Sequence, residues 1–185
     1  MANLEPLIQS IPVAPLKLAS LEGCRTLADQ VNNYLVSFRH ESPTNVGQAD
    51  SLQGYCADSY LLECECPRFG SGEGKGVLKE SVRGCDLFIM VDVTNYSLTY
   101  RVNGYENHMS PDNHYQDLKR IISAADGKAR RINVIMPFLY EGRQHKRSKR
   151  ESLDCALMLQ ELVDMGVSNI LTFDAHDPRV SNSIP

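Results

Sequence analysis

The chain has 185 residues, which is enough for one domain of ordinary size with a hydrophobic core. A hydrophobic content of 42% argues against global disorder, and a formal net charge of −4 argues against a general nucleic-acid binder. The first residues carry no secretory signal, and no apolar run reaches the ~18 residues that a membrane span needs. We therefore expect a cytoplasmic protein with no nucleic-acid and no membrane partner.

The chain begins with residues rich in Pro, Ser and Gln, and residues 1–14 are predicted to form a flexible arm before a domain at 15–185. Four elements are predicted next, in chain order: a strand at residues 16–19, a helix with Ser20 or Thr26 as its N-cap, a polar loop at 40–53 and a strand at 60–64.

Three continuous apolar runs follow, at residues 87–91, 132–137 and 170–173. Such runs are typical of strands that are covered on both faces. A helical pattern separates the first run from the second, and another separates the second from the third. Strands that alternate with helices in this way predict an α/β fold with a central, mainly parallel sheet flanked by helices.

The ends of the two intervening helices carry recognisable signals. Ser110 is expected to cap the first helix, with Pro111 at its first position and Gly127 closing it. Gly166 is expected to end the second helix. Residues 93–109 do not follow the strand–helix alternation, and Asn103-Gly104 inside them predicts a small two-stranded hairpin.

The six cysteines are expected to be reduced, because the chain shows no secretory context. Most are expected to be buried as small hydrophobic residues. Cys64 and Cys66 form the one close pair, but C-x-C is not the usual spacing of a zinc site, and no second pair lies at ligand spacing. The cysteines therefore predict no zinc site.

Ionisable residues gather where the last apolar run ends, at Asp174, His176 and Asp177. The carboxyl end of a buried strand is where ligands bind in α/β proteins. In an extended continuation of the strand, Asp174 and His176 would project to the same side. A carboxylate and an imidazole suit Mg²⁺ or Mn²⁺ held partly through substrate phosphates, although a purely structural histidine is the simpler alternative.

Two other segments allow both a functional and a structural interpretation. Residues 143–150 contain five Lys or Arg side chains after the second apolar run, and they form either a phosphate clamp or a solvated loop. Residues 69–76 contain four glycines, so their backbone either contacts a nucleotide or forms a surface turn. The glycine segment fits neither a Walker loop nor G-x-G-x-x-G.

Read together, five ordered motifs resemble the amino-terminal half of the ribose-phosphate pyrophosphokinases, also called phosphoribosyl pyrophosphate synthetases. The family patterns are R-F-x-D-G-E, E-S-V-R-G-x-D-V-F-I-I, N-D-N-L-M-E-L-L, V-I-P-Y-x-x-Y-A-R-Q-D and D-L-H-A. They correspond here to residues 68–73, 80–90, 111 onward, 134–145 and 174–177. The chain is thus identified as a divergent member, similar over residues 16 to 185.

The resemblance implies a phosphoribosyltransferase-like domain, the first of two, in an enzyme that transfers the diphosphoryl group of ATP to ribose 5-phosphate with Mg²⁺ or Mn²⁺. It implies that Phe69 and Glu73 hold the adenine, partly across a subunit boundary, while Arg143 and Gln144 contact ATP. Asp174 and His176 would bind the metal, and His176 and Arg143 would be catalytic. The flap over the phosphates would comprise Lys146, Arg147, Lys149 and Arg150. The resemblance also implies a homo-oligomer, a dimer-based hexamer in the full-length protein.

The chain departs from the family patterns at several positions. Ser71 stands where the family has Asp in R-F-x-D-G-E, and His145 stands where the family has Asp after Arg-Gln. The basic loop is one residue short, and residues 93–109 are longer than usual. The acidic D-D-x-x-D-T-G-G-T-type loop that binds ribose 5-phosphate in the family's second half occurs nowhere in these 185 residues.

Two interpretations follow from these departures. The first is that the chain is the ATP-side domain of a diphosphokinase, inactive without the second domain that holds ribose 5-phosphate. The alternative is a non-catalytic regulatory paralogue that keeps the fold and its subunit contacts.

Overall fold

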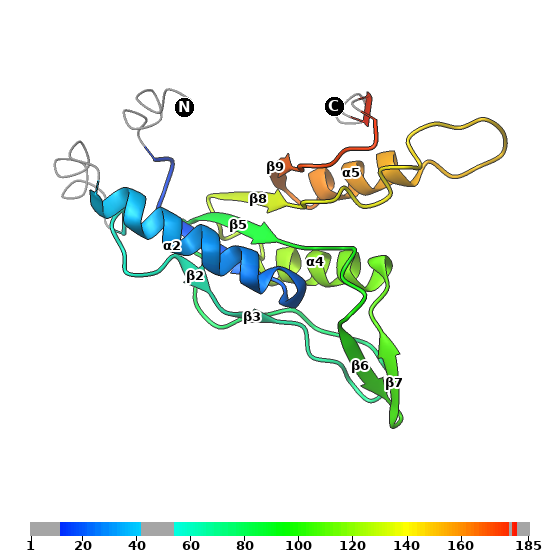
Figure 1. The fold of residues 1–185 in the computed structure, drawn as a ribbon, viewed down its shortest axis with the longest axis horizontal. Helices are drawn as coiled ribbons and strands as arrows, with labels where there is room; N and C mark the ends of the chain where they lie inside the picture. The colour runs from blue at the N-terminus through cyan, green and yellow to red at the C-terminus, as the bar shows by residue number, and fades with distance from the viewer. Residues whose placement is uncertain (1–11, 42–53, 178, 181–185) are drawn as a thin grey trace.

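The computed structural model describes residues 12–41, 54–177 and 179–180. Its centre is a five-stranded sheet with the strand order β2-β1-β5-β8-β9 (Figure 1). Every neighbouring pair in this sheet is parallel. The strands are β1 (Leu16–Ser20), β2 (Leu61–Leu62), β5 (Asp86–Met90), β8 (Arg131–Ile135) and β9 (Val167–Leu171). The predicted α/β class with a mainly parallel central sheet is confirmed.

Helices cover both faces of the sheet, and the side chains of β5 alternate between them. Leu87 and Ile89 are fully buried in the larger core, together with the apolar faces of α4 (Pro111–Ala125) and α5 (Asp154–Asp164). Met90 lies in a second cluster on the opposite face, where α2 (Arg25–Glu41) packs. This burial on both faces explains the continuous apolar run of the strand.

The ends of α4 follow the sequence signals. The Ser110 hydroxyl accepts a hydrogen bond from the Asn113 backbone amide at 3.2 Å, and Pro111 occupies the first turn. Asp126 takes a left-handed conformation at the C-cap, with φ 48°, and Gly127 follows with φ 61°. A glycine with positive φ also follows α5, where Gly166 has φ 87°. The predicted helix ends are therefore confirmed.

The predicted hairpin is also present. Strands β6 (Thr99–Val102) and β7 (Tyr105–His108) pair antiparallel, and Asn103 and Gly104 both have positive φ, as a tight hairpin turn requires. The hairpin projects from the body of the domain near the N-terminal end of α4 (Figure 1).

The strand predicted at residues 60–64 is wrong as a single element. Leu61 and Leu62 pair with β1, whereas β3 (Cys64–Glu65) pairs antiparallel with β4 (Val77–Leu78) in a separate sheet. The Glu63 carbonyl accepts the Lys79 amide at 3.0 Å, so the chain leaves β1 for β4 at this residue.

The predicted N-cap of the first helix is wrong too. A 3-10 turn, η1 (Glu22–Cys24), precedes α2, so Thr26 lies inside the helix, and the Ser20 hydroxyl donates to the Leu21 carbonyl instead. Residues 1–11 of the predicted arm and residues 42–53 of the predicted loop lie outside the described residues, while residues 40 and 41 still belong to α2.

All six cysteines are free, and four of them are buried. Burial, aided by Asp92, raises the pKa of Cys24 to about 12, and burial raises the pKa of Cys64 to about 11. These thiols stay protonated at neutral pH and pack as apolar groups. No described helix is both long enough and apolar enough to cross a bilayer.

Candidate functional site

The loops that follow β8 and β9 are joined by backbone hydrogen bonds at the carboxyl edge of the sheet. The amides of Phe173 and Asp174 both donate to the Pro137 carbonyl, at 3.1 and 3.0 Å, and the Leu139 amide donates to the Asp174 carbonyl at 3.2 Å. Strand β9 ends at Leu171 and not at Phe173, as the apolar run predicted. Beyond Leu171 the regular ladder is replaced by the two bonds to the Pro137 carbonyl and by a single parallel bridge between Phe138 and Asp174.

Asp174 and His176 lie on this edge with exposed side chains. The chain bends at Phe173 and at His176, so the regular extended continuation that was expected to align the two side chains is interrupted. Within the described residues, neither side chain has a hydrogen bond or an ion pair, so both are available to a ligand.

The donor set at this edge limits which metal it fits. The described residues contain no group of three or more His, Cys, Asp or Glu side chains that could hold a metal ion. One carboxylate and one imidazole therefore cannot form an all-protein cage. They fit Mg²⁺ or Mn²⁺ that reaches the site with the phosphates of a nucleotide, since Mg²⁺ commonly binds through one or two carboxylates plus substrate phosphates.

The basic loop, residues 143–150, leaves the sheet through a closed neck. The Gln144 side-chain amide donates to the Ser152 carbonyl at 2.7 Å, and the Cys155 amide donates to the Gln144 carbonyl at 3.3 Å. Gln144, which the resemblance assigns to ATP, thus also ties the start of the loop to the start of α5.

Beyond the neck, the loop presents its cations to solvent. Its five cations are all exposed, and in the part of the chain that the structure describes none of them is in an ion pair: they are Arg143, Lys146, Arg147, Lys149 and Arg150. Glu151 is occupied by the Ser148 amide and hydroxyl, at 3.2 and 3.0 Å, and these bonds lower the pKa of its carboxyl. The loop therefore offers uncompensated positive charge to an anion.

His145 connects the basic loop to the segment after β9. Its Nε2 lies 3.3 Å from Oδ2 of Asp177, and its ring lies 5.6 Å from the ring of His176, centroid to centroid. Arg179 holds the other side of Asp177, with Nε 2.9 Å from Oδ1. The hydrogen bonds from Arg179 lower the pKa of Asp177, so this carboxylate is ionised at neutral pH.

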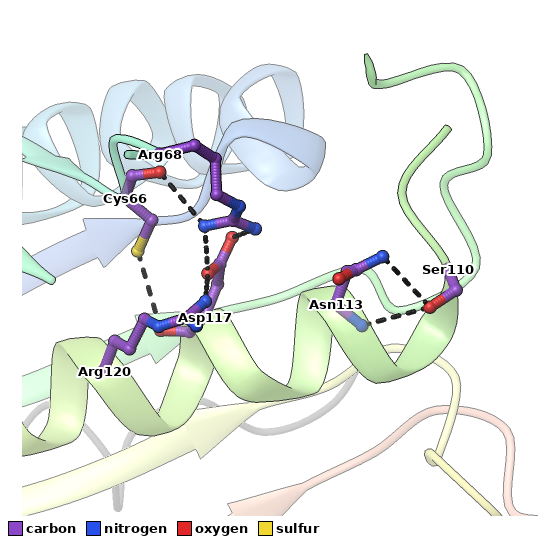
Figure 2. A network of polar contacts seen from close by, with 6 residues as sticks. All are labelled: Cys66, Arg68, Ser110, Asn113, Asp117 and Arg120. Carbon is purple, nitrogen blue, oxygen red and sulfur yellow. Dashed lines mark hydrogen bonds and ion pairs between the residues drawn. The ribbon is translucent and has the colours of Figure 1, made fainter. Parts of the chain in front are cut away.

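The glycine-rich segment is anchored to α4 by a buried ion-pair network (Figure 2). Arg68 donates to both carboxylate oxygens of Asp117, at 2.7 and 2.8 Å, and Arg120 donates to one of them at 2.6 Å. Gly76 comes so close to α4 that a Cβ there would stand 2.3 Å from the Arg120 carbonyl oxygen. The described geometry therefore gives Gly76 a packing role.

Phe69 and Glu73 lie at the outer turn of this segment. Phe69 is 53% exposed, and the Glu73 carboxylate accepts a hydrogen bond from the Ser71 hydroxyl at 2.7 Å. The segment packs against α4 and the hairpin, where Gly72 faces Val102. The loops after β8 and β9 run above the body of the domain in Figure 1, whereas the hairpin lies below it. Within one chain, Phe69 and Glu73 are thus not brought to the predicted residues after β8 and β9.

Asp117 and His145 were not among the predicted site residues, and Asp177 was named only as part of the ionisable group after the last apolar run. Asp117 reads as an ordinary polar residue on α4, and nothing in its local pattern identifies Arg68 as its partner. His145 and Asp177 each lie next to predicted residues, but the contact between them joins two loops that are distant in sequence. The departures of His145 from the R-Q-D pattern and of Asp177 from the D-L-H-A pattern were the available signals.

Three comparisons place the chain among known proteins. A family model described as the N-terminal domain of ribose phosphate pyrophosphokinase matches residues 16–166. The ribose-phosphate pyrophosphokinases of Corynebacterium ammoniagenes and Bacillus cereus are each 29% identical over 167 residues, which is 89% of this chain and 41% of theirs. The crystal structure of phosphoribosylpyrophosphate synthetase from Mycobacterium smegmatis superposes with a TM-score of 0.62 at 22% identity.

That superposition covers 92% of this chain and 46% of the Mycobacterium smegmatis chain. The chain thus spans less than half the length of the curated relatives it matches.

Proposed function

The chain belongs to the ribose-phosphate pyrophosphokinase family, of which it is an amino-terminal domain, and from this premise we propose that it binds ATP for a diphosphokinase reaction. In that reaction the 1-hydroxyl of ribose 5-phosphate attacks the β-phosphorus of ATP, the bond from that phosphorus to the α-phosphate oxygen breaks, and AMP leaves. The products are 5-phosphoribosyl 1-diphosphate and AMP.

The observation that carries the proposal is the joining of two loops at one edge of the sheet. Bonds between residues 137–139 and 173–174 hold the basic loop beside the segment that contains Asp174 and His176. His145 and Asp177 reinforce this arrangement at 3.3 Å. A metal-bound polyphosphate carries charge of both signs. The exposed cations suit its phosphates, and the carboxylate of Asp174, which has no partner among the described residues, suits its metal ion.

The residues of this chain would contribute binding and charge neutralisation. Arg143 and the flap cations would hold phosphate oxygens, and their positive charge would stabilise the negative charge that develops on the leaving AMP. Asp174 and His176 would hold Mg²⁺ or Mn²⁺, which would supply positive charge to the phosphates and make the β-phosphorus a better electrophile. Arg143 and His176 would be catalytic in this sense of contact with the reacting groups.

We further propose that a second subunit completes the nucleotide site. Phe69 and Glu73 lie at the hairpin end of the domain and would contact the adenine bound by a neighbouring copy. The exposure of Phe69, at 53%, supports a contact outside its own chain. This arrangement agrees with the homo-oligomer, a dimer-based hexamer in the full-length protein, that the resemblance implies.

Calorimetric titration of ATP with Mg²⁺ into the chain tests the proposal. ATP is expected to bind, and Asp174→Ala and Arg143→Ala are each expected to weaken binding by about tenfold, since each removes a charge-assisted contact. Arg130→Ala, which removes an exposed cation directly before β8, is the matched control and should bind as the parent chain does. Equal affinity in all four proteins, or no binding by the parent chain, contradicts the proposed function.

The chain alone is expected to release no AMP from ATP and ribose 5-phosphate. The acidic loop that binds ribose 5-phosphate in the family does not occur in its 185 residues. Chromatography of a mixture with Mg²⁺ measures AMP directly. AMP release that depends on ribose 5-phosphate and is lost in Arg143→Ala would show instead that the chain is active by itself.

One observation favours the alternative, a non-catalytic regulatory paralogue. The Ser71 hydroxyl engages the Glu73 carboxylate at 2.7 Å, so the acidic group assigned to the adenine already has a partner. A regulatory chain should change the rate of AMP release by an active family member in proportion to the amount added. No change in that rate at any ratio argues against regulation.

A further inference from the structure

The contact between His145 and Asp177 joins the two loops of the proposed ATP site. His145 lies in the basic loop directly after the neck residue Gln144, and Asp177 follows His176 in the segment after β9. Their closest atoms, Nε2 and Oδ2, are 3.3 Å apart. A side-chain contact thus adds to the backbone bonds that join the two loops nearer the sheet.

This pair differs from the surface ion pairs of the chain because it is shielded from solvent. The His145 side chain is 9% exposed and the Asp177 side chain 16% exposed. Exposed pairs contribute little because water competes for both partners. Here a burial of this extent removes most of that competition, so the contact can fix the geometry of both loops.

Within the described residues, His145 has no alternative polar partner. Its Nδ1 is buried and forms no hydrogen bond there, so Asp177 provides the one polar contact of the ring. Asp177 is held from the other side by Arg179, which bonds to it through both the backbone amide and the guanidinium. Asp177 is therefore fixed by its own segment, and His145 is fixed by Asp177.

The third member of the arrangement is His176. Its ring lies against the ring of His145 at 5.6 Å between centroids, with the planes inclined by 49°. His176 itself is exposed, whereas the ring behind it is buried. The buried His145 ring thus supports one side of the exposed imidazole and restricts the rotamers open to it.

From this geometry we propose that His145 and Asp177 are positioning residues, which hold the His176 imidazole and the first cations of the basic loop in a common arrangement for the β- and γ-phosphates of ATP. Neither residue contacts the nucleotide. This inference rests on the proposed function, because it assigns the pair a task at that same site. The expected effect of losing the pair is a loss of affinity for the distal phosphates and not for the nucleoside.

The test compares ATP with AMP, each with Mg²⁺, on the purified chain and on His145→Ala, Asp177→Ala and the double variant. Each single variant is expected to weaken ATP binding on the order of tenfold and to leave AMP binding unchanged. The double variant is expected to lose no more than the worse single variant, since both remove the same contact. Losses that multiply in the double variant, or that affect AMP equally, overturn the inference.

Two further variants separate positioning from a loss of fold. Asp177→Asn keeps an oxygen that can accept from His145 Nε2, so it is expected to retain more ATP affinity than Asp177→Ala. Arg130→Ala, which removes an exposed cation directly before β8, is the matched control with ATP affinity near that of the parent chain. Equal losses in both Asp177 variants, or an equal loss in Arg130→Ala, contradict the positioning role.

Hydrogen exchange followed by mass spectrometry provides a readout that needs no nucleotide. In Asp177→Ala the amides of residues 139–147 and 172–180 are expected to exchange several-fold faster, while those of α4 stay protected. Unchanged exchange in residues 139–147 overturns the inference even if ATP binds. If the parent chain binds no ATP, the proposed function and the positioning role both fall, whereas normal ATP binding by every variant removes the positioning role alone.

Discussion

Asp117 binds two guanidinium groups at once and is itself buried, with 5% of its surface exposed. Arg68 reaches it from the glycine-rich segment, and Arg120 reaches it from the next turn of α4 (Figure 2). Removing charges from water is costly, and only close, multiple hydrogen bonds offset that cost. The bidentate geometry supplies these bonds, so the segment depends on one carboxylate for its attachment to the helix.

Asp117→Asn is expected to destabilise the chain by about 3 kcal/mol, because the substitution leaves the Arg68 guanidinium buried without a countercharge. Urea denaturation at neutral pH measures the change. Asp29→Asn, at an exposed position of α2, is the matched control and should unfold with the parent chain. A similar midpoint for Asp117→Asn and the parent would mean that the network contributes nothing to stability.

Gly76→Ala is expected to cost about 1–3 kcal/mol, since the added Cβ would stand 2.3 Å from a backbone oxygen of Arg120 and force the segment away from α4. Gly70→Ala would place its Cβ in open space and should change stability by less than about 0.5 kcal/mol. Thermal unfolding of the two variants side by side checks this, and comparable losses at both positions would refute the packing role of Gly76.

Residue patterns predicted those features that depend on a few neighbours in sequence. Ser110 and Pro111 begin a helix through their own backbone chemistry, and Asn103-Gly104 turns a hairpin for the same reason. The partners of Asp117 and His145 could not be predicted, because long-range packing brings them together. His145 and Asp177 stand where the family motifs have Asp and Ala, and the structure shows that these two departures contact each other.

At the scale of elements, α4 and α5 are joined by polar groups above their apolar contact. The Tyr115 hydroxyl on α4 donates to the Glu161 carboxylate on α5 at 2.7 Å, and Lys119 pairs with the other oxygen at 2.7 Å. Partial burial alone would raise the pKa of Glu161, but the bonds from Lys119 and Tyr115 outweigh it and lower the pKa. The folded chain therefore binds this proton less tightly than the unfolded chain does.

Glu161→Gln is expected to lower stability at pH 7 by about 0.5 kcal/mol, a small value because the carboxylate is 45% exposed and screened by water. A carboxyl group whose pKa is lower in the folded chain stabilises the fold at pH values above its unfolded-state pKa. That contribution is lost as the pH falls through the folded-state pKa. The difference in unfolding free energy between variant and parent should therefore vanish at pH values below the ordinary pKa range of carboxyl groups. Urea unfolding at several pH values measures it, and a difference that grows on acidification would reverse the assigned sign.

The presence of the strands was predicted better than the residues at which they begin and end. The apolar runs located β5, β8 and β9, because burial on both faces needs only local composition. The break between β2 and β3 depends on a competing partner strand, and the end of β9 depends on how the loops after β8 and β9 bond to each other. Information about which strands are neighbours is not contained in any single run.

At the scale of the whole molecule, charge is distributed unevenly. The chain has a net charge of −4, yet residues 143–150 carry five exposed cations at one end of the sheet. An anion approaching this end meets a local field opposite in sign to that of the protein as a whole. Charges in solvent are screened over about 8 Å at physiological ionic strength, so this local field dominates at short range.

ATP affinity is accordingly expected to fall on the order of tenfold between about 50 mM and about 500 mM NaCl. Replacing the four flap cations by Gln should weaken binding at low salt and flatten the dependence on salt. Calorimetry at a series of salt concentrations checks both. An equally steep dependence in the substituted chain would place the responsible charges elsewhere.

The parts of the candidate site were recognisable in the sequence, but their assembly was not. The motifs placed Arg143 and Asp174 after neighbouring strands, and parallel topology then required both loops to share one edge. Phe69 and Glu73 follow no strand of the main sheet, so topology alone could not position them. The structure places their segment on α4 and the hairpin, and in Figure 1 the hairpin lies below the body of the domain while the loops after β8 and β9 run above it.

The neck formed by Gln144 and Ser152 has a consequence for evolutionary change in this chain. Because the two ends of the loop are clasped, insertions or deletions at its tip leave the register of β8 and the start of α5 undisturbed. The length and charge of the tip can therefore change without disturbing the fold of the domain. The same insulation makes the tip a tolerant place to graft a fluorophore or an epitope.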